Sequence, residues 1–297
     1  MDLDTVHMPI WDIDRLGQLR GSPSLDHLEI YLDRDADHHE PAPVKQVQPV
    51  PNVTHLSLSA GMSLSTAAAS NFLSHFTRLT HLDLNLIDYC NLGLFLGAVS
   101  PTLVSLIVEL DNWDIWLEDD SSLLMNSHLA RLTNLEELSL GEHTFSHGIF
   151  PTLSSLANLH GLTLWLLFDA HFDATPLKRY LREHPPLRRL SFHAFSGGAD
   201  YIPSEHPDDP AVSSGSYSFG RGWRLPEWTP SFTFEDAKEV LRLVDAAGIV
   251  LEGGLRRAVE VQELRWREEE YLKGRRAEAQ RKLGGCSRLT DDSSDEE

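Results

Sequence analysis

One pattern of apolar positions returns seven times along the chain: an apolar residue, two spacers, Leu, one spacer and another apolar residue. Successive copies start 28, 26, 24, 32, 24 and 28 residues apart. Self-similarity at such a period predicts a repeat architecture, in which each unit packs against its neighbours. The copies are Leu25/Leu28/Ile30, Val53/Leu56/Leu58, Leu79/Leu82/Leu84, Leu103/Leu106/Val108, Leu135/Leu138/Leu140, Leu159/Leu162/Leu164 and Leu187/Leu190/Phe192.

Within each copy, apolar and polar residues alternate, as in the His-Leu-Glu-Ile-Tyr segment at 27–31. Alternation predicts a strand with one buried side and one side that faces solvent. A sheet covered by helices on both faces would instead contain continuous apolar strands. The pattern therefore favours a sheet with one open face.

Between the strands, the apolar residues change to the spacing of helices. Repeated strand–helix–strand units predict parallel strands joined by right-handed crossovers. We expect Thr175 to cap the last of these helices, because Pro176 would then occupy its first position. The segments with helical spacing are Phe72/Leu73/Phe76, Leu92/Phe95/Leu96/Val99, Met125/Leu129/Leu132 and Leu177/Leu181/His184.

These patterns divide the chain into six parts. The array itself is assigned to residues 25–195, as seven degenerate repeats. Around it we expect an incomplete N-terminal repeat or cap at 1–24, a Gly/Pro/Ser-rich loop at 196–232, a helix–strand cap at 233–254, a long charged helix at 255–283 and a disordered acidic tail at 284–297. The cap helix should run from Thr233 to Val244 and the terminal strand over 249–251, while the charged helix should lie in solvent.

The repeated phrase resembles the leucine-rich repeat. The segments Leu-Thr-His-Leu at 79–82 and Asn-Leu-Glu-Glu-Leu at 134–138 are similar to the arrays of fungal F-box/leucine-rich-repeat proteins. The resemblance implies an α/β solenoid, a horseshoe with parallel strands on its inner face and helices outside. In that family the F-box docks on a cullin ligase adaptor, and the array selects the substrate.

The chain departs from the family pattern in two respects. The 24 residues before the first copy contain no recognisable F-box. Family repeats also carry Asn or Cys three positions after the last apolar residue. The residues there are Asp33, Gly61, Ile87, Asp111, His143, Leu167 and Phe195.

Charge narrows the classes of partner. The 297 residues carry a net charge of −20, of which 1–254 contribute −19, whereas 255–283 carry +3. An acidic array repels phosphate groups, so we expect no nucleic acid and no membrane surface as partner, and a protein with a basic surface instead. With only two cysteines, no basic-then-apolar leader and no apolar run of membrane-spanning length, the chain is expected in the cytoplasm or nucleus.

Outward strand positions should form columns across the sheet. The candidates for partner binding on this inner face are His27, Glu29, Tyr31, His55, His81, Asp83, Asn85, Glu109, Glu137, Trp165, Arg189 and His193. Trp113 and Trp116 are candidate anchors on a neighbouring loop. Ser293 and Ser294, each followed by Glu three positions later, resemble sites of acidophilic kinases.

Candidate chemistry is sparse. Three histidines beside Glu29 and Asp83 could hold a metal, but a flat column lacks tetrahedral convergence, so we expect no metal and no cofactor. Because no phosphate loop, nucleophile elbow or catalytic Cys/His spacing is present, we expect no enzyme. The favoured function is a non-enzymatic protein–protein recognition scaffold, substrate-receptor-like as in F-box proteins. Two alternatives stay open: a regulator of a small GTPase, acting through Arg189, and a structural protein that self-associates through 255–283.

Overall fold

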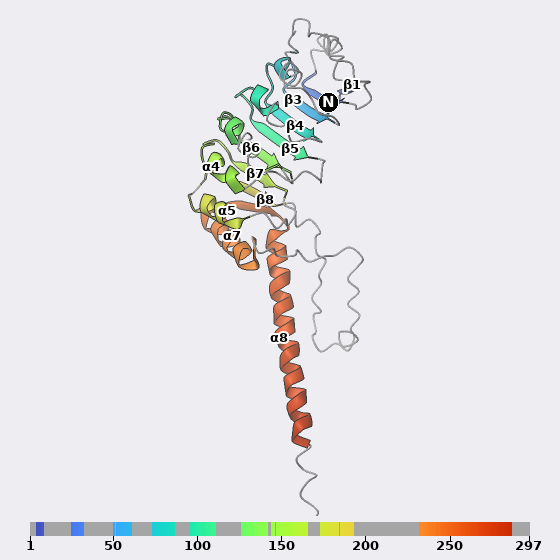
Figure 1. The fold of residues 1–297 in the computed structure, drawn as a ribbon, viewed down its shortest axis with the longest axis vertical. Helices are drawn as coiled ribbons and strands as arrows, with labels where there is room; N and C mark the ends of the chain where they lie inside the picture. The colour runs from blue at the N-terminus through green and yellow to red at the C-terminus, as the bar shows by residue number, and fades with distance from the viewer. Residues whose placement is uncertain are drawn as a thin grey trace, which may run out of the picture.

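The computed structural model describes residues 4–8, 25–32, 50, 52–60, 73–86, 95–110, 126–141, 144–145, 147–165, 173–183, 185–192 and 232–286. These residues form an α/β structure around one parallel sheet (Figure 1). Its strands are β1 (Asp4–Met8), β2 (His27–Leu32), β3 (His55–Ala60), β4 (His81–Leu86), β5 (Ser105–Leu110), β6 (Glu137–Leu140), β7 (Gly161–Leu164), β8 (Arg189–Phe192) and β9 (Val250–Gly253). Each strand pairs with the next one along the chain, which is consistent with a solenoid-like arrangement.

The seven strands predicted from the repeated phrase are confirmed as β2 to β8. β1 was not identified in the sequence and extends the sheet within the segment expected to be an incomplete repeat; it pairs in parallel with β2. β9 extends the sheet at the other end, one to two residues beyond the predicted terminal strand.

Each strand from β3 to β8 begins with the same pair of backbone hydrogen bonds. The amides of Thr54 and His55 both donate to the carbonyl of Asp26, at 3.0 Å each. The amides of Thr80 and His81 donate in the same way to Thr54, at 2.9 and 3.0 Å. The pairs at 104/105, 136/137, 160/161 and 188/189 repeat this contact with the preceding strand. These bonds fix the register, so equivalent positions of neighbouring repeats lie side by side.

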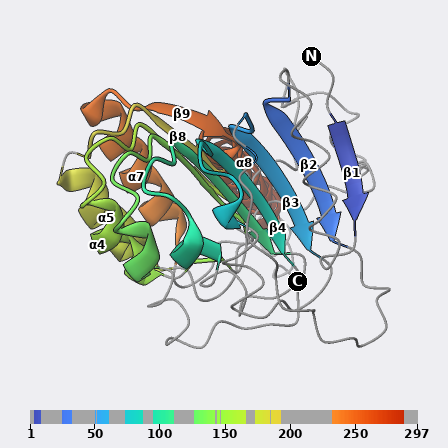
Figure 2. The same ribbon diagram turned by 90° about the horizontal axis from the view of Figure 1, so that it is seen from above.

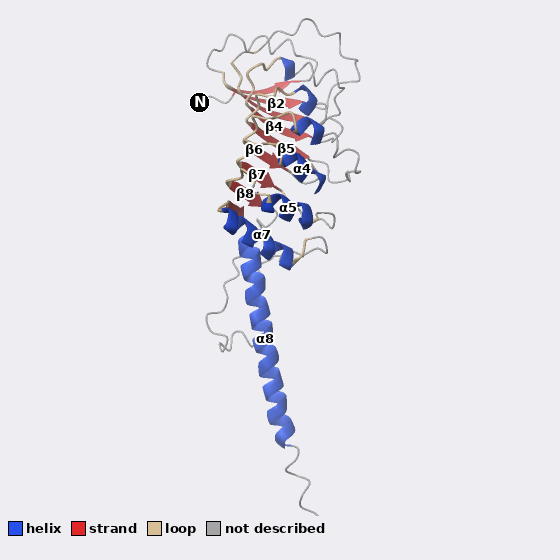
Figure 3. Ribbon diagram, turned by 90° about the vertical axis from the view of Figure 1, so that its left-hand side faces the viewer, coloured by secondary structure: helices blue, strands red, loops and turns tan. Residues whose placement is uncertain are grey.

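Apart from the long C-terminal helix, the described helices pack on one side of the sheet, as Figures 2 and 3 show. They include η2 (His147–Ile149), α4 (Phe150–Leu153), α5 (Ala174–Arg182) and α7 (Phe234–Ala247), with shorter helical segments at 95–98 and 126–129. The apolar side chains of the strands point toward these helices and form one continuous core. Leu28, Leu82 and Leu106 are at most 1% exposed within it.

Two local features differ from the sequence-based expectations. The helical turn formed by η2 and α4 was not predicted, although Phe150 and Leu153 bury one face of it. Asp173, and not Thr175, caps α5: its backbone is extended, and its carboxylate accepts from the Thr175 amide at 2.8 Å. The helix therefore starts two residues earlier than expected, and Pro176 occupies its third position, where a missing N–H is also harmless.

The C-terminal cap consists of the helix α7 followed by the strand β9. Thr233 caps α7, and Asp236 reaches back to the Thr233 amide, which completes a capping box. Gly248 ends the helix with a φ of 68°, a left-handed conformation that glycine adopts without strain. The assignment of Phe232 to the expected loop at 196–232 is wrong, because this residue is 1% exposed and belongs to the core.

A single long helix, α8 (Leu255–Cys286), projects from the end of the array (Figure 1). The expectation that it lies in solvent throughout is wrong for its first turns, where Leu255, Val259 and Val261 are buried. Trp266 packs edge-on against Phe234 of α7, with ring centroids 4.5 Å apart. The last strand of an array exposes an apolar end, and the first turns of α8 help to cover it.

Among the described residues, no helix is both long enough and apolar enough to cross a bilayer.

The burial pattern predicts which leucines stabilise the array. Leu138 on β6 is 2% exposed, so Leu138→Ala should lower the free energy of unfolding by about 2–5 kcal/mol. Leu272 on α8 is 46% exposed, so Leu272→Ala should change it by less than about 0.5 kcal/mol. Chemical denaturation of both variants measures the difference. Equal losses in the free energy of unfolding would show that Leu138 does not belong to the core.

Candidate functional site

The side of the sheet opposite the described helices carries three columns of side chains, which we call the sheet face. Most of its described side chains are partly exposed, whereas Gly161 and Ser191 are buried. The first column is His27, His55, His81, Ser105, Glu137, Gly161 and Arg189; the second is Glu29, Ser57, Asp83, Ile107, Ser139, Thr163 and Ser191; the third contains Tyr31, Ser59, Asn85 and Glu109. The strand register therefore confirms the first two predicted columns, and the third from position 31 to position 109.

The first column begins with three stacked imidazole rings, which we call the histidine stack. The ring centroids of His27 and His55 lie 4.9 Å apart, and those of His55 and His81 lie 3.9 Å apart. The two pairs of rings are inclined by only 11° and 13°. In-register parallel strands place identical side chains about 4.8 Å apart, which is the spacing that stacking requires.

Two threonine hydroxyls contact the Nδ1 atoms of two rings in this stack. The hydroxyl of Thr54 lies 2.9 Å from Nδ1 of His55, and the hydroxyl of Thr80 lies 2.9 Å from Nδ1 of His81. Burial lowers the pKa of His55, and the neighbouring His81 and His27 lower it further, against an opposing effect of Asp26. A neutral ring is therefore favoured at the centre of the stack.

Two carboxylates flank the stack in the second column. Asp83 on β4 and Glu29 on β2 lie on either side of Ser57 on β3. Burial raises the pKa of Asp83; a hydrogen bond with Ser57 opposes this effect, and the charge of Glu29 adds to it. Negative charge is thus concentrated beside the imidazole rings.

On strands β6 to β8, the first column of the sheet face contains a carboxylate, a glycine and a guanidinium instead of imidazole rings. Glu137 and Arg189 form an ion pair at 2.7 Å, although β7 lies between their strands. Gly161 of β7 makes this possible, because a Cβ there would lie only 1.8 Å from the Glu137 carboxylate. The sequence identified both charged residues but not their pairing, nor the glycine beneath them. This pair neutralises the charge of Glu137, and the other carboxylates of the columns are Glu29, Asp83 and Glu109 on β2–β5 and Glu252 on β9, which continues the second column beside Ser191.

The remaining candidates are placed as follows. Trp165 directly follows β7, is 38% exposed, and donates from Nε1 to the Ser139 hydroxyl at 3.2 Å. The side chain of Tyr31 lies outside the described residues, as do His193, Trp113, Trp116, Ser293 and Ser294 in full.

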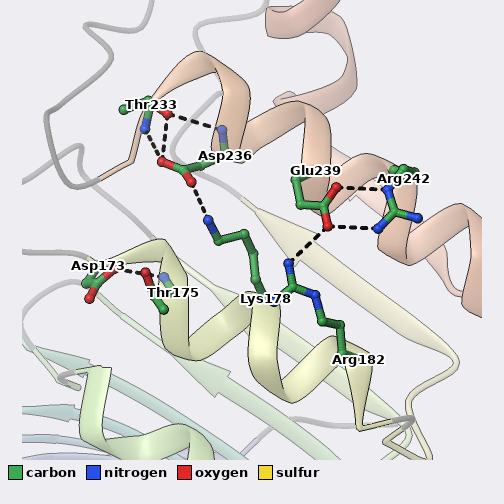
Figure 4. A network of polar contacts seen from close by, with 8 residues as sticks. All are labelled: Asp173, Thr175, Lys178, Arg182, Thr233, Asp236, Glu239 and Arg242. Atoms are coloured by element: carbon green, nitrogen blue, oxygen red, sulfur yellow. Dashed lines mark hydrogen bonds and ion pairs between the residues drawn. The ribbon is translucent and has the colours of Figure 1, made fainter.

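A second group of charges joins α5 to α7 (Figure 4). Lys178 donates to the carboxylate of Asp236, which also accepts from the amide and hydroxyl of Thr233. Arg182 and Arg242 both bind Glu239, at 3.1 and 2.8 Å. The hydrogen bonds from Arg242 and then Arg182 lower the pKa of Glu239 to about 2. The charges in this network are paired with one another, so the network holds the two helices together.

Over the described ranges, no group of three or more His, Cys, Asp or Glu side chains is arranged to hold a metal ion. No protein-family model matches the chain, and no curated protein matches it either. The geometry of the sheet face is therefore the feature of this chain that bears on its function.

The network of Figure 4 predicts a pH-dependent contribution to stability. Burial raises the pKa of Asp236, but hydrogen bonds from Lys178 and Thr233 outweigh it and leave the pKa below its usual value. A carboxyl whose pKa is lowered by folding stabilises the fold above its unfolded-state pKa, and this contribution is lost as the pH falls through the folded-state pKa. Asp236→Ala should therefore cost about 1.5–3 kcal/mol at pH 7, and less as the pH falls below about 4.

Glu235→Ala is the matched control, because Glu235 is exposed and pairs with Lys238 one turn away. It should cost less than about 0.5 kcal/mol. Denaturation of both variants at pH 7 and pH 3 measures the difference. A loss in Asp236→Ala that equals the control, or that is unchanged at pH 3, would contradict this account.

Proposed function

We propose that this chain is a non-enzymatic protein-recognition scaffold of the leucine-rich-repeat type, and that it captures a protein with a basic surface on its sheet face. The observation that carries the proposal is the set of in-register columns, which gathers polar and charged side chains on the side away from the helices. Rigid strands hold these side chains in fixed positions, so little conformational entropy is lost when a partner binds.

Charge supports a basic partner. Glu29, Asp83 and Glu109 come from three of the four strands β2 to β5 and are partly exposed, while the cations Arg189 and Lys178 already have acidic partners. Complementary charge steers a partner toward a surface and rejects partners of like charge. Interaction through this face should therefore weaken as the salt concentration rises.

The similarity of the 79–82 and 134–138 segments to F-box/leucine-rich-repeat arrays gives the proposal a more specific form. In that form, the captured protein is a substrate for ubiquitin ligation, and the chain acts as the substrate-binding part of a ligase. Affinity capture from the native cell, followed by mass spectrometry, tests it: a cullin adaptor captured together with substrates would support the ligase form.

Charge reversal tests the binding face. A triple variant, Glu29→Lys, Asp83→Lys and Glu109→Lys, should lose capture of the basic partner; Glu137 is left unchanged because it neutralises Arg189. The matched control reverses three exposed carboxylates away from the sheet face, Glu183 at the end of α5, Glu235 on α7 and Glu270 on α8, and should retain capture. The neutral set Glu29→Gln, Asp83→Asn and Glu109→Gln checks that a loss does not come from unfolding.

Capture and thermal denaturation are measured for all three variants. A triple reversal on the sheet face that leaves capture and its salt dependence unchanged would refute the proposal. Loss of capture in the helix control alone would assign binding to the other side of the molecule.

A further inference from the structure

Exposed apolar side chains concentrate on one short stretch of α8. Five large apolar side chains are exposed among the described residues, and three of them, Trp266, Tyr271 and Leu272, belong to this helix. Trp266 packs against α7, whereas Tyr271 and Leu272 lie more than about 100° around the helix from it. They are 41% and 46% exposed. Neighbouring exposed apolar side chains, unlike scattered ones, indicate an interaction surface.

The charges before and after this apolar pair have opposite signs. Residues 268–270 are three carboxylates, whereas residues 273–276 contain three exposed cations and a glycine. The order of charges along the helix therefore reverses at the midpoint between Tyr271 and Leu272.

Ion pairs within this helix stay on one side of that midpoint. Arg265 binds Glu269 at 3.2 Å before it, and Lys282 binds Glu278 at 2.9 Å after it. These contacts stabilise single turns of the helix, but they do not join the acidic segment to the basic one.

The two features share one stripe of the helix surface. Its residues follow one another at spacings of three or four, which places them on one side of an α-helix. The stripe consists of Leu264, Glu268, Tyr271, Arg275 and Ala279. Glu268 and Arg275 are equally far from the midpoint, and so are Leu264 and Ala279. Beside an identical stripe that runs in the opposite direction, carboxylate would therefore meet guanidinium and apolar residues would meet apolar residues.

The net charge of the chain favours the same orientation. The 297 residues carry a net charge of −20, and α8 projects away from the acidic array (Figure 1). A parallel pair of helices would set two acidic arrays side by side and residues 268–270 against their own copies. In an antiparallel pair, about 50 Å of helix separates the two arrays at 1.5 Å per residue, whereas exposed charges are screened over about 8 Å at physiological ionic strength.

The exposure of α8 also favours a partner. Residues 269–282 are exposed throughout, although isolated helices are marginal in water and most helical stability in proteins comes from the packing of one face. Gly274 is unfavourable within such a segment. A Cβ there would meet nothing within 4 Å, so no contact of the described residues requires this glycine. Packing against a second helix would stabilise the segment.

We propose that α8 pairs antiparallel with α8 of a second copy of this chain, with a two-fold axis near Tyr271 and Leu272. Both copies contribute the same surface, so Glu268 of each copy binds Arg275 of the other around an apolar centre. The pairing goes beyond the proposed function and does not depend on it. It places two sheet faces in one assembly, which raises the apparent affinity for a partner with two binding sites.

Sedimentation velocity of the full chain tests the pairing. The measured mass should rise with protein concentration from 33.4 kDa toward twice that value. The association should weaken between about 0.1 M and about 1 M salt, because the screening length falls from about 10 Å to about 3 Å. In a parallel pair like charges would meet, so added salt would strengthen the association, and that result would overturn the proposed orientation.

Charge reversal tests the central contact. Arg275→Glu sets two carboxylates together at two symmetric places and should weaken the association about tenfold or more. Glu268→Arg should do the same. The exchange of both charges in one chain restores opposite partners in the antiparallel pair and should restore association. The matched control is Arg188→Glu, which makes the same change of net charge at an exposed position of the array and should associate as the unmodified chain does.

The apolar centre is tested with Leu272→Ala. This variant should leave the stability of the dilute single chain unchanged but weaken the association about five- to tenfold, because the side chain is removed at two symmetric places. Thermal denaturation of dilute samples checks that every variant is folded.

Three results would overturn the inference: a mass of 33.4 kDa at every concentration, equal association of the Arg275→Glu and Arg188→Glu variants, or no association after the exchange of Glu268 and Arg275. Each of them leaves capture on the sheet face untouched, because that proposal is tested by reversal of Glu29, Asp83 and Glu109 on other elements.

Discussion

The in-register pairing of parallel strands is the constraint on which the rest of the molecule depends. Two amides at the start of each strand from β3 to β8 bind one carbonyl of the preceding strand, so neighbouring repeats cannot slip past each other. A slip by one residue would transfer the leucines from the core to the opposite face. The same bonds stack His27, His55 and His81, and they set Glu29 and Asp83 beside that stack.

An array of this kind has two ends, and the described C-terminal end is covered by several independent contacts. Lys178 and Arg182 of α5 bind Asp236 and Glu239 of α7. Arg256 of α8 then binds Asp245 of α7 at 2.6 Å, beyond the buried Leu255. The cap thus uses ion pairs at its margin and apolar contacts at its centre, and it lies at the end of the sheet away from β2–β5.

The strands of the array could be predicted because their signal is periodic and repeats seven times. The columns followed from the same alternation, since parallel pairing in register leaves one way to align the phrases. Features that depend on a single contact could not be predicted. Asp173 and Thr175 are both good capping residues, and only the extended backbone at Asp173 decides between them.

The pairing of Glu137 with Arg189 across Gly161 needs the three-dimensional register and the absence of one Cβ, and neither is visible in a one-dimensional pattern. The burial of Leu255 and Val259 was missed for a related reason: the dense charge of α8 predicts exposure, whereas the open end of the array requires cover. The histidine stack was foreseen as a column, but the contacts of Thr54 and Thr80 with its rings depend on hydroxyl geometry that the sequence does not contain.

The central claim is that the sheet face, and not the helical side, contacts the partner protein. Site-specific photo-crosslinking tests it most directly, with the photoreactive residue placed either at Ser57, between Glu29 and Asp83, or at Ser155, in the exposed turn after α4. The account predicts that irradiation of the captured complex joins the partner to position 57 and not to position 155. A partner joined at position 155 and absent from position 57 would contradict it.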